Sequence, residues 1–306
     1  MTRGRHAAVT GISHGRRGGD AGGAHDRGMA TIAHLTDLHL VEEEHAARRG
    51  ADRLRLGWLT LGLPVNAGRR RRRALVGLTE ARRSGADHLV VTGDLTEDGV
   101  DAQFALLAAV LAESGWDPAR VTLVPGNHDL YADGRAWERA LSGPLRAFAP
   151  TSAAGAAVAL PGAVVVAVST AVPQRIPRSA GALDGRQLAR VAELARETRQ
   201  SGRALVLAQH HPPLAHPVPG WQWVDGLREH GALGEILRGF DHAHVLHGHT
   251  HRAADRPVRA GASIRIFSAE STAHGAAPLR LYRARHGRLW AEPAAERMHA
   301  AAFALA

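Results

Sequence analysis

Residues 31–40 read TIAHLTDLHL, a β-rich run that leads into the polar string Thr36-Asp-Leu-His39. The same arrangement returns at residues 88–94, HLVVTGD, and at residues 121–129, VTLVPGNHD. Longer helical patterns separate these runs, and short strands that alternate with helices are typical of parallel sheets joined by crossover helices. The sequence therefore predicts an α/β fold in which strands lead into residues that can bind metal ions.

The alternation of short strands and helices continues along the chain. The predicted strands cover residues 31–36, 88–92, 121–124, 163–169, 204–208, 244–246, 263–268 and 279–284. The predicted helices cover residues 70–84, 100–114, 135–148, 184–201 and 227–238. Asp184 as N-cap and Gly202 just past the end bracket the fourth helix. No internal repeat or Pro/Ser-rich linker divides residues 29–306, so we predict one domain there.

Residues 1–28 differ in composition from the rest. They carry five Arg against two Asp, are rich in Gly and Ala, and show no hydrophobic periodicity, which predicts a disordered basic tail. The tail lacks the apolar run of a secretory signal, and no stretch in the chain is long and apolar enough to cross a membrane. We expect a cytoplasmic protein, with Met29 as an alternative start.

Composition limits the chemistry. The 306 residues include no cysteine, so disulfides, thiolate zinc sites and cysteine nucleophiles are excluded, and any metal must be held by His, Asp, Glu or Asn. All 38 basic residues are arginine, against 29 acidic residues, for a net charge of +9. We interpret this as a compositional bias and do not expect a nucleic-acid partner.

Five polar motifs follow predicted strands. They are Thr36-Asp37-Leu38-His39, Gly93-Asp94, Gly126-Asn127-His128-Asp129, His210-His211-Pro212-Pro213 and Gly248-His249-Thr250-His251. Loops at the carboxyl ends of strands converge in α/β folds, so the motifs are expected to meet. In an extended segment each D-x-H or H-x-H pair would project to one side. Carboxylates and imidazoles without thiolates suit Mn, Fe, Zn or Co, and Asp94 could bridge two ions.

In this order the motifs resemble those of the calcineurin-type metallophosphoesterases, over about residues 32–272. The resemblance implies a four-layer α/β/β/α sandwich of two mixed sheets flanked by helices. It also implies two divalent or trivalent metal ions, with Mn, Fe or Zn as the candidates. In the implied ligand set, Asp37, His39 and His251 bind the first ion, Asn127, His210 and His249 bind the second, and Asp94 bridges both.

The resemblance implies hydrolysis by a metal-bound hydroxide. In this scheme His128 faces the leaving oxygen and gives it a proton or a hydrogen bond, while Asp129 fixes the orientation of His128. The strings around the first three motifs are similar to those of class III cyclic-nucleotide phosphodiesterases. A small phosphodiester such as a cyclic nucleotide is thus the expected substrate.

Three alternatives use the same metal site: hydrolysis of a nucleotide-linked lipid pyrophosphate, of a phosphomonoester, or of nucleic-acid ends. An Arg-rich nucleic-acid-binding protein is the non-enzymatic alternative, and the oligomeric state is open. We expect residues 69–73, all arginine, to form a solvated helix face, and the apolar stretch 56–64 around Trp58 to bury itself. Glu97 and Asp98 are expected in a turn before the next helix, and Trp221 and Trp223 in a loop.

Overall fold

The structure, a computed structural model, describes residues 28–259, 261–262 and 265–292. The predicted basic tail, except Gly28, and the first two residues of the predicted strand 263–268 lie outside these ranges. The strands are β1 Ala30–Leu35, β2 His88–Thr92, β3 Val121–Val124, β4 Ala157–Ala159, β5 Ala163–Ala167, β6 Ala204–Ala208, β7 Ala243–His247, β8 Ala254–Pro257, β9 Arg265–Ser268, β10 Arg280–Arg285 and β11 Arg288–Ala291. The α-helices are α1 Gly50–Leu59, α2 Ala67–Arg83, α3 Asp101–Ser114, α4 Ala136–Ser142, α5 Ala149–Ser152, α6 Gly185–Gln200 and α7 His230–Gly239. The 3₁₀ turns are η1 Glu43–Ala47, η2 Pro118–Arg120, η3 His128–Leu130, η4 Arg146–Phe148 and η5 Pro219–Trp223.

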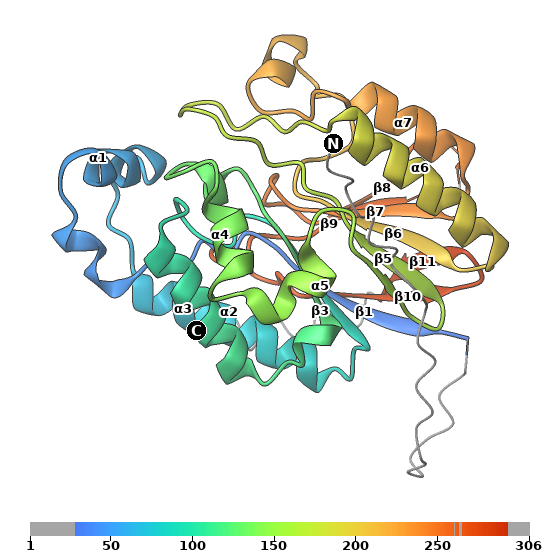
Figure 1. Cartoon of the computed structure of the whole chain (residues 1–306), viewed down its shortest axis with the longest axis horizontal. Coiled ribbons are helices and arrows are strands. Elements are labelled where there is room, and N and C mark those ends of the chain that lie inside the picture. The colour runs from blue at the N-terminus through green and yellow to red at the C-terminus, as the bar shows by residue number, and fades with distance from the viewer. Residues whose placement is uncertain (1–27, 260, 263–264, 293–306) are drawn as a thin grey trace, which may run out of the picture.

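The strands form two mixed sheets (Figure 1). One sheet has the order β11-β10-β1-β2-β3, in which β1, β2 and β3 are parallel and β10 and β11 are antiparallel. The other has the order β4-β5-β6-β7-β9-β8, with four parallel strands between two antiparallel edges. All the parallel strands of one sheet end at the same edge, which is where the motif loops begin.

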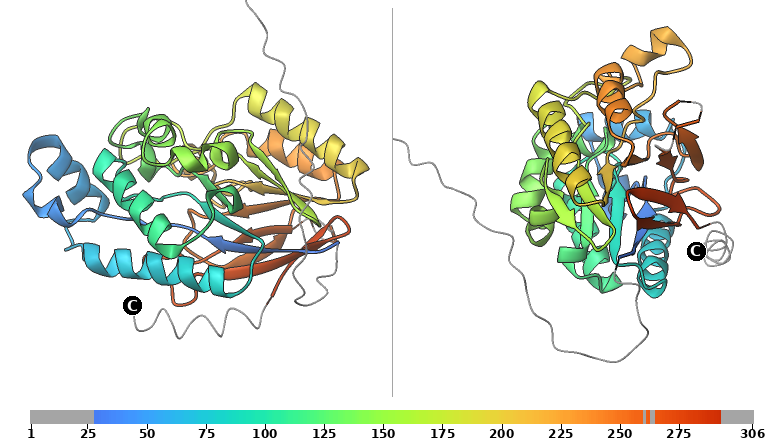
Figure 2. Two further views of the ribbon diagram at one scale, coloured as in Figure 1. Left: turned by 60° about the horizontal axis from the view of Figure 1, so that its bottom comes forward. Right: turned by 90° about the vertical axis from the view of Figure 1, so that its right-hand side faces the viewer.

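Three apolar cores separate four layers, because neighbouring residues of a strand point to opposite faces. On β2, Leu89 and Val91 pack toward α2 and α3, whereas Val90 faces the other sheet. On β6, Leu205 and Leu207 pack toward α6 and α7. In the left view of Figure 2, α2 and α6 accordingly lie on opposite sides of the strands. The predicted α/β/β/α sandwich is confirmed.

The helix ends follow local chemistry. Asp184 caps α6 as predicted: its side chain accepts from Gln187 N–H in a capping box, and Gly202 follows the helix with φ +66°. The single helix predicted over 135–148 is wrong. The chain leaves helical geometry at Gly143, and Pro144 cannot donate the backbone hydrogen bond that would continue the helix. Two shorter turns, η4 and α5, follow the break.

The sequence did not predict α1 or the edge strands β4, β8 and β11. These strands have three or four residues, and β8 consists of Ala, Asp, Arg and Pro, so neither length nor hydrophobic alternation indicates a strand. On α1, Leu56 is buried but Trp58 is exposed, so the prediction that the stretch 56–64 buries itself is wrong. Within the described residues, no helix is both long and apolar enough to cross a bilayer.

Candidate metal centre

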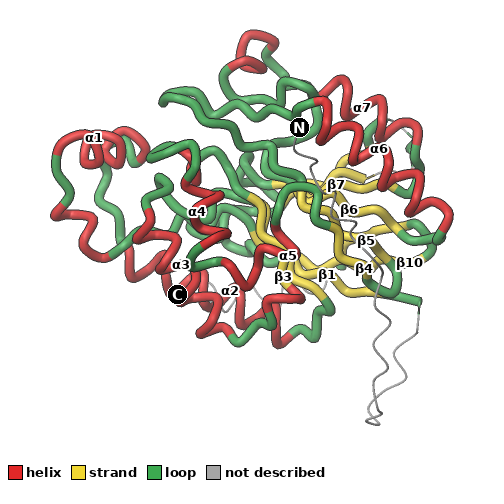
Figure 3. Tube along the Cα trace, in the orientation of Figure 1, coloured by secondary structure: helices red, strands yellow, loops and turns green. Residues whose placement is uncertain are grey.

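The motif loops of both sheets gather beyond the carboxyl ends of the strands, in the region between α4 and α7 (Figure 3). Backbone hydrogen bonds hold neighbouring loops together. Asp37 N donates to Gly93 O at 3.0 Å, His39 N donates to Asp94 O at 2.9 Å, and Gly248 N donates to His210 O at 3.1 Å. These bonds tie the first motif loop to the second, and the fifth motif loop to the fourth.

Five candidate ligands have left-handed backbone conformations. Asp37, His39, Asp94, His249 and His251 have φ between +46° and +67°. The prediction that each pair projects from an extended segment is therefore wrong, although each pair does reach a shared site. A non-glycine residue in this region is strained by about 1 kcal/mol or more, and such residues concentrate at functional sites. The fold holds these side chains in place against a local conformational preference.

Two glycines allow the loops to approach closely. A Cβ at Gly126 would lie 2.1 Å from Asp94 Oδ1, and a Cβ at Gly248 would lie 1.9 Å from Thr36 Oγ1. Neither space admits a side chain. The glycines thus let the third and fifth motifs pack against the carboxylates of the first two.

The first predicted ligand set forms a compact cluster. His251 Nε2 lies 3.2 Å from Asp37 Oδ1 and 3.3 Å from His39 Nε2, while His39 Nε2 lies 4.0 Å from Asp94 Oδ2. Two atoms bound to one ion at about 2.1 Å lie roughly 3 Å apart, so the cluster has the dimensions of a single ion site. Asp37 Oδ1 is buried without a hydrogen bond, and this oxygen faces the space between the ligands.

The second set shares Asp94. His210 Nε2 lies 3.3 Å from Asp94 Oδ2 and 3.2 Å from Asn127 Oδ1. The ring of His249 lies 5.1 Å from that of His210, centroid to centroid. Asp94 Oδ2 thus borders both sets, as a bridging carboxylate must. Six of the seven predicted ligands fall in two groups whose atoms lie close enough to hold an ion: Asp37, His39, Asp94 and His251 form one, and His210 and His249, together with His211, form the other. Asn127 Oδ1 borders the second group through His210. Nitrogen and oxygen ligands of this kind suit a borderline divalent ion.

The charges in the cluster attract one another strongly. Burial alone would raise the pKa of the Asp94 carboxyl, but the imidazoles of His210 and His128 outweigh burial and hold that pKa well below its usual range. Burial would lower the pKa of His210, yet the Asp94 and Asp37 carboxylates raise it to about 9. The cluster is therefore a place where cations, whether protons or metal ions, are stabilised.

Outer partners select which ring nitrogen faces the centre. His210 Nδ1 donates to Thr92 O at 2.8 Å, which leaves Nε2 for an ion. His249 Nε2 lies 2.9 Å from Asp225 Oδ1, which leaves Nδ1. His39 Nδ1 lies 3.1 Å from Glu97 Oε2. Carbonyl or carboxylate partners of this kind fix the tautomer and orientation of metal-binding histidines.

His128 lies beside the cluster, but Asp129 does not orient it. His128 Nε2 is 3.9 Å from Asp94 Oδ2, and His128 Nδ1 donates to the backbone carbonyl of Glu97 at 2.6 Å. The buried Asp129 carboxylate instead accepts hydrogen bonds from backbone N–H groups of Leu95, Thr96 and Gly126 and from the Thr96 hydroxyl. The predicted contact is wrong because those donors already occupy both oxygens.

Burial, followed by repulsion from Asp94, raises the pKa of the Asp129 carboxyl to about 6. Three of its four hydrogen bonds, those from Leu95 and Thr96, join the second motif loop to the third, so Asp129 positions loops rather than the imidazole. This role still links Asp129 to His128, since the same loops carry the Glu97 carbonyl and the histidine itself.

Sequence reasoning missed two acidic residues. Glu97 lies in the predicted turn before α3, but its contacts were not predicted: it is buried between His39 and Arg70. Asp225 lies outside the five motifs, yet its carboxylate contacts His249 Nε2. The sequence shows that Glu97 follows the second motif closely, but residue spacing does not reveal which histidine either acidic residue contacts.

The arginine run is only partly a solvated face. Arg70 donates to Glu97 and to His39 O, and the buried Arg73 donates to Thr272 O and Gly275 O. The helical period brings these two residues to the side of α2 that faces the site, whereas Arg69 and Arg72 are exposed. The prediction is therefore wrong for Arg70 and Arg73.

His211 lies beside the second cluster but has no nitrogen free for an ion. Its Nδ1 pairs with the Thr170 hydroxyl at 2.8 Å, and its Nε2 donates to Ser179 O at 2.7 Å. Beyond His249, a cavity of about 560 Å³ opens between the loop after β6 and strands β8 and β9. Its walls include Leu214, Asp225, Arg256 and Ile266, so both apolar and charged side chains face it.

Comparison with known proteins assigns this centre to a family. The profile of the calcineurin-like phosphoesterases matches residues 30–253, a segment that contains all seven candidate ligands. A cAMP/cGMP dual specificity phosphodiesterase of Mycobacterium tuberculosis is 30% identical over 232 residues, covering 74% of this chain and 63% of that protein. A probable cyclic nucleotide phosphodiesterase of Rhodococcus erythropolis is 28% identical over 221 residues, covering 72% and 64%. The chain thus spans less than two thirds of the length of either relative.

Solved structures share the fold at lower identity. A dimetal phosphatase from Danio rerio superposes with a TM-score of 0.61 at 14% identity, covering 86% of this chain and 98% of that one. A purple acid phosphatase from yellow lupin gives 0.51 at 11%, covering 85% and 50%. With two mixed sheets, buried His/Asp clusters at their carboxyl ends and a profile match over most of its length, the chain belongs to the calcineurin-like phosphoesterase family.

Proposed function

We propose that this protein is a dinuclear metal-dependent phosphodiesterase that acts on a cyclic nucleotide or a similar small anionic diester. The observation that carries the proposal is Asp94 Oδ2, which borders both ligand clusters. Mn, Fe or Zn ions held by the seven residues would polarise a phosphoryl oxygen and lower the pKa of water. The names of the two relatives support a diester rather than a monoester.

His128 is the proposed proton donor. Its Nδ1 donates to the Glu97 carbonyl, and a carbonyl can only accept, so Nε2 is the atom that gains or loses a proton. In the reaction, water adds to phosphorus and the bond from phosphorus to the leaving oxygen breaks, while that oxygen takes the proton from His128 Nε2. One proton of the water stays on the new phosphate oxygen, and the other is released to solvent, from which Nε2 takes up a proton before the next turnover. Glu97 and Asp129 act as positioning residues in this scheme.

The cavity beside His249 is the proposed place for the organic part of the substrate. At about 560 Å³ it falls within the range of small-molecule sites. Its apolar lining residues Leu214 and Ile266 suit a base or another carbon-rich group, while Arg256, the neighbour of Ile266 across β8 and β9, suits an anion.

A substrate panel tests the proposal. The protein loaded with Mn, Fe or Zn is assayed on bis-p-nitrophenyl phosphate and cyclic AMP, against p-nitrophenyl phosphate, a sugar-nucleotide lipid and single-stranded DNA. We expect kcat/KM for a diester to exceed the others at least tenfold, which corresponds to about 1.4 kcal/mol of transition-state preference. Higher kcat/KM on the monoester, lipid or DNA would replace the diester assignment, and inertness with all three metals would overturn it.

A further inference from the structure

The cavity beside His249 contains two arginines that pair with no acidic residue. Arg252 follows the fifth motif and Arg256 lies on β8, and both line the cavity together with His249. Within the part of the chain that the structure describes, neither guanidinium group has a hydrogen-bond or ion-pair partner. Both side chains are accessible to solvent, so an incoming ligand can contact them. Arginine in a concave site beside a catalytic centre is suited to hold an anionic part of the ligand.

The pairing of β8 with β9 places Arg256 on the face that lines the cavity. Side chains alternate between the two faces of a strand, and Arg256 lies opposite Ile266, which also lines the cavity. Asp255 and Arg265, the preceding residue on each strand, lie on the other face and form an ion pair there. The strand pair therefore neutralises its charges on one face and leaves a positive charge on the face toward the cavity.

The acidic residues of the cavity walls are engaged elsewhere. The cavity is lined by parts of three segments, residues 212–226, 247–256 and 266–268. These segments contain two acidic residues, Asp225 and Asp255. Asp225 Oδ1 lies 2.9 Å from His249 Nε2, and Asp255 is in the ion pair on the other face. A bound anion would therefore supply the negative charge that the cavity arginines lack.

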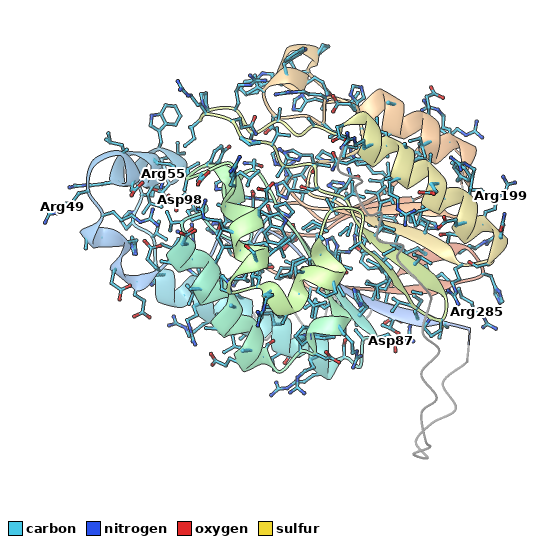
Figure 4. The ribbon with its side chains drawn as sticks, in the orientation of Figure 1. Arg49, Arg55, Asp87, Asp98, Arg199 and Arg285 are labelled. Atoms are coloured by element: carbon cyan, nitrogen blue, oxygen red, sulfur yellow. The ribbon has the colours of Figure 1, made fainter. Side chains whose placement is uncertain are left out.

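Arginines on the opposite side of the metal centre do have buried acidic partners. Arg55 Nε and Arg48 Nη1 each donate to Asp98 Oδ2 at 2.8 Å, and Figure 4 shows Arg55 directed toward Asp98. Arg70 likewise donates to the buried Glu97. These arginines hold segments of the protein together. The two cavity arginines have no such structural task in the described part of the chain.

The place of Arg256 in the sheet separates it from the metal centre. Strand β7 leads into His249, and β8 is the second strand away from β7 in the order β7-β9-β8. Neighbouring strands lie about 4.8 Å apart, so β8 runs about 10 Å to the side of β7. A cyclic mononucleotide with its phosphate on the metal ions offers only a sugar and a base to the cavity. A second phosphate, one nucleoside away from the reacting phosphate, fits this separation.

From these observations we propose that the substrate is a dinucleotide whose reacting phosphate lies on the metal ions and whose second phosphate is held by Arg252 and Arg256. Guanidinium groups suit this role because their N–H groups match the oxygens of a phosphate. The inference rests on the proposed diester hydrolysis and adds the substrate class. Linear and cyclic dinucleotides share this chemistry, two phosphates separated by a nucleoside, so the test includes both.

Kinetics on matched substrates test the proposal. The metal-loaded protein is assayed on cyclic di-AMP and on the linear dinucleotide pApA. Cyclic AMP and bis-p-nitrophenyl phosphate are the reference diesters, since neither has a second phosphate. We expect kcat/KM for at least one dinucleotide to exceed that for cyclic AMP about tenfold or more, and the better dinucleotide identifies the linear or the cyclic form.

Variants of the cavity test the role of its charge. Arg252→Gln/Arg256→Gln should lower kcat/KM on the better dinucleotide about tenfold or more, mainly by raising KM, and change kcat/KM on bis-p-nitrophenyl phosphate less than about twofold. Arg259→Gln is the matched control, because Arg259 is exposed just after β8 and does not line the cavity. Calorimetric titration with a phosphorothioate analogue of pApA measures binding without turnover and should show the same loss in the double variant.

The results distinguish this inference from the proposed function. Hydrolysis of bis-p-nitrophenyl phosphate with no preference for either dinucleotide would overturn the inference and leave the diester assignment in place. Wild-type kinetics and analogue binding in the double variant would do the same. Inertness toward every diester with Mn, Fe and Zn would overturn the proposed function, and the inference with it.

Discussion

Two groups of buried histidines differ in what surrounds them. His34, His88 and His244 lie within strands, where the ring nitrogens of the first two meet threonine hydroxyls and His244 Nε2 donates to the carbonyl of Gly287. The cluster histidines lie in loops at strand ends and meet carboxylates. Burial lowers the pKa of His88 to about 3, whereas carboxylates raise that of His210 to about 9 despite burial. Burial alone therefore says little about function, and the charge of the partner separates the groups.

The largest effect is expected where the two clusters meet. Asp94→Asn removes the negative charge that both clusters share, so both ions should bind at least 100-fold more weakly. The loss of a residue that only hydrogen-bonds to a metal ligand already weakens metal binding about 10- to 100-fold, and the loss of the ligand itself should cost more. Metal analysis after gel filtration should fall from two ions per chain toward none, with hydrolysis lost. Retention of both ions would show that Asp94 is not shared.

His128→Ala separates catalysis from metal binding. Because His128 is not in either predicted ligand set, metal content should stay at two ions while kcat falls on the order of 10²- to 10⁴-fold. His286→Asn is the matched control, since His286 is an exposed histidine in the β10–β11 turn and asparagine tolerates its positive φ. Wild-type turnover in His128→Ala would remove this residue from the mechanism.

Asp225→Asn tests whether an outer carboxylate distinguishes the two clusters. It should weaken the ion held by His249 about 10- to 100-fold and leave the other ion in place. Titration of the metal-free protein should show one weakened site and one unchanged site. Equal weakening of both would contradict the assignment of His249 to the second ion.

The buried strand histidines should make the free energy of unfolding depend on pH. The folded pKa of His88 lies below its unfolded value near 6.5, so the unfolded chain takes up the proton first and stability falls as pH drops from about 6.5 toward 3. Between pH 7 and 5 this histidine should remove about 2 kcal/mol from the free energy of unfolding.

Urea unfolding of the metal-free protein at both pH values measures this loss. His88→Gln should lose less stability on acidification than wild type, while the His286→Asn control should match wild type. Identical pH dependence in wild type and His88→Gln would contradict the assignment of His88 as a neutral structural histidine.

The sequence predicted which residues gather at the candidate site better than it predicted their backbone conformations and hydrogen-bond partners. Motif order identified seven residues that the fold brings together, because the order of strands constrains which loops can meet. The left-handed conformations of Asp37 and His251 were missed, since an extended backbone was assumed. The partner of His128 was missed because it is a backbone carbonyl, that of Glu97. Every residue type has such a carbonyl, so the sequence does not indicate which one accepts the hydrogen bond.

Outside the site too, elements with a clear apolar pattern were predicted and elements without one were missed. Parallel strands with continuous apolar runs, such as β2, were predicted at their observed bounds. Helix α1 was missed because a helix held by Arg55 and Asp98 rather than by a core lacks the usual inward apolar pattern. Its outward stripe around Trp58 resembled a buried segment, because composition alone does not show which side of a helix faces water.

The central claim is that two ions occupy adjoining clusters that share Asp94. A crystal of the manganese-loaded protein, measured at the metal absorption edge, tests it most directly. We predict two anomalous peaks, one among Asp37, His39 and His251 and one among Asn127, His210 and His249, with the Asp94 carboxylate between them. A single peak, or peaks away from these residues, would contradict the account.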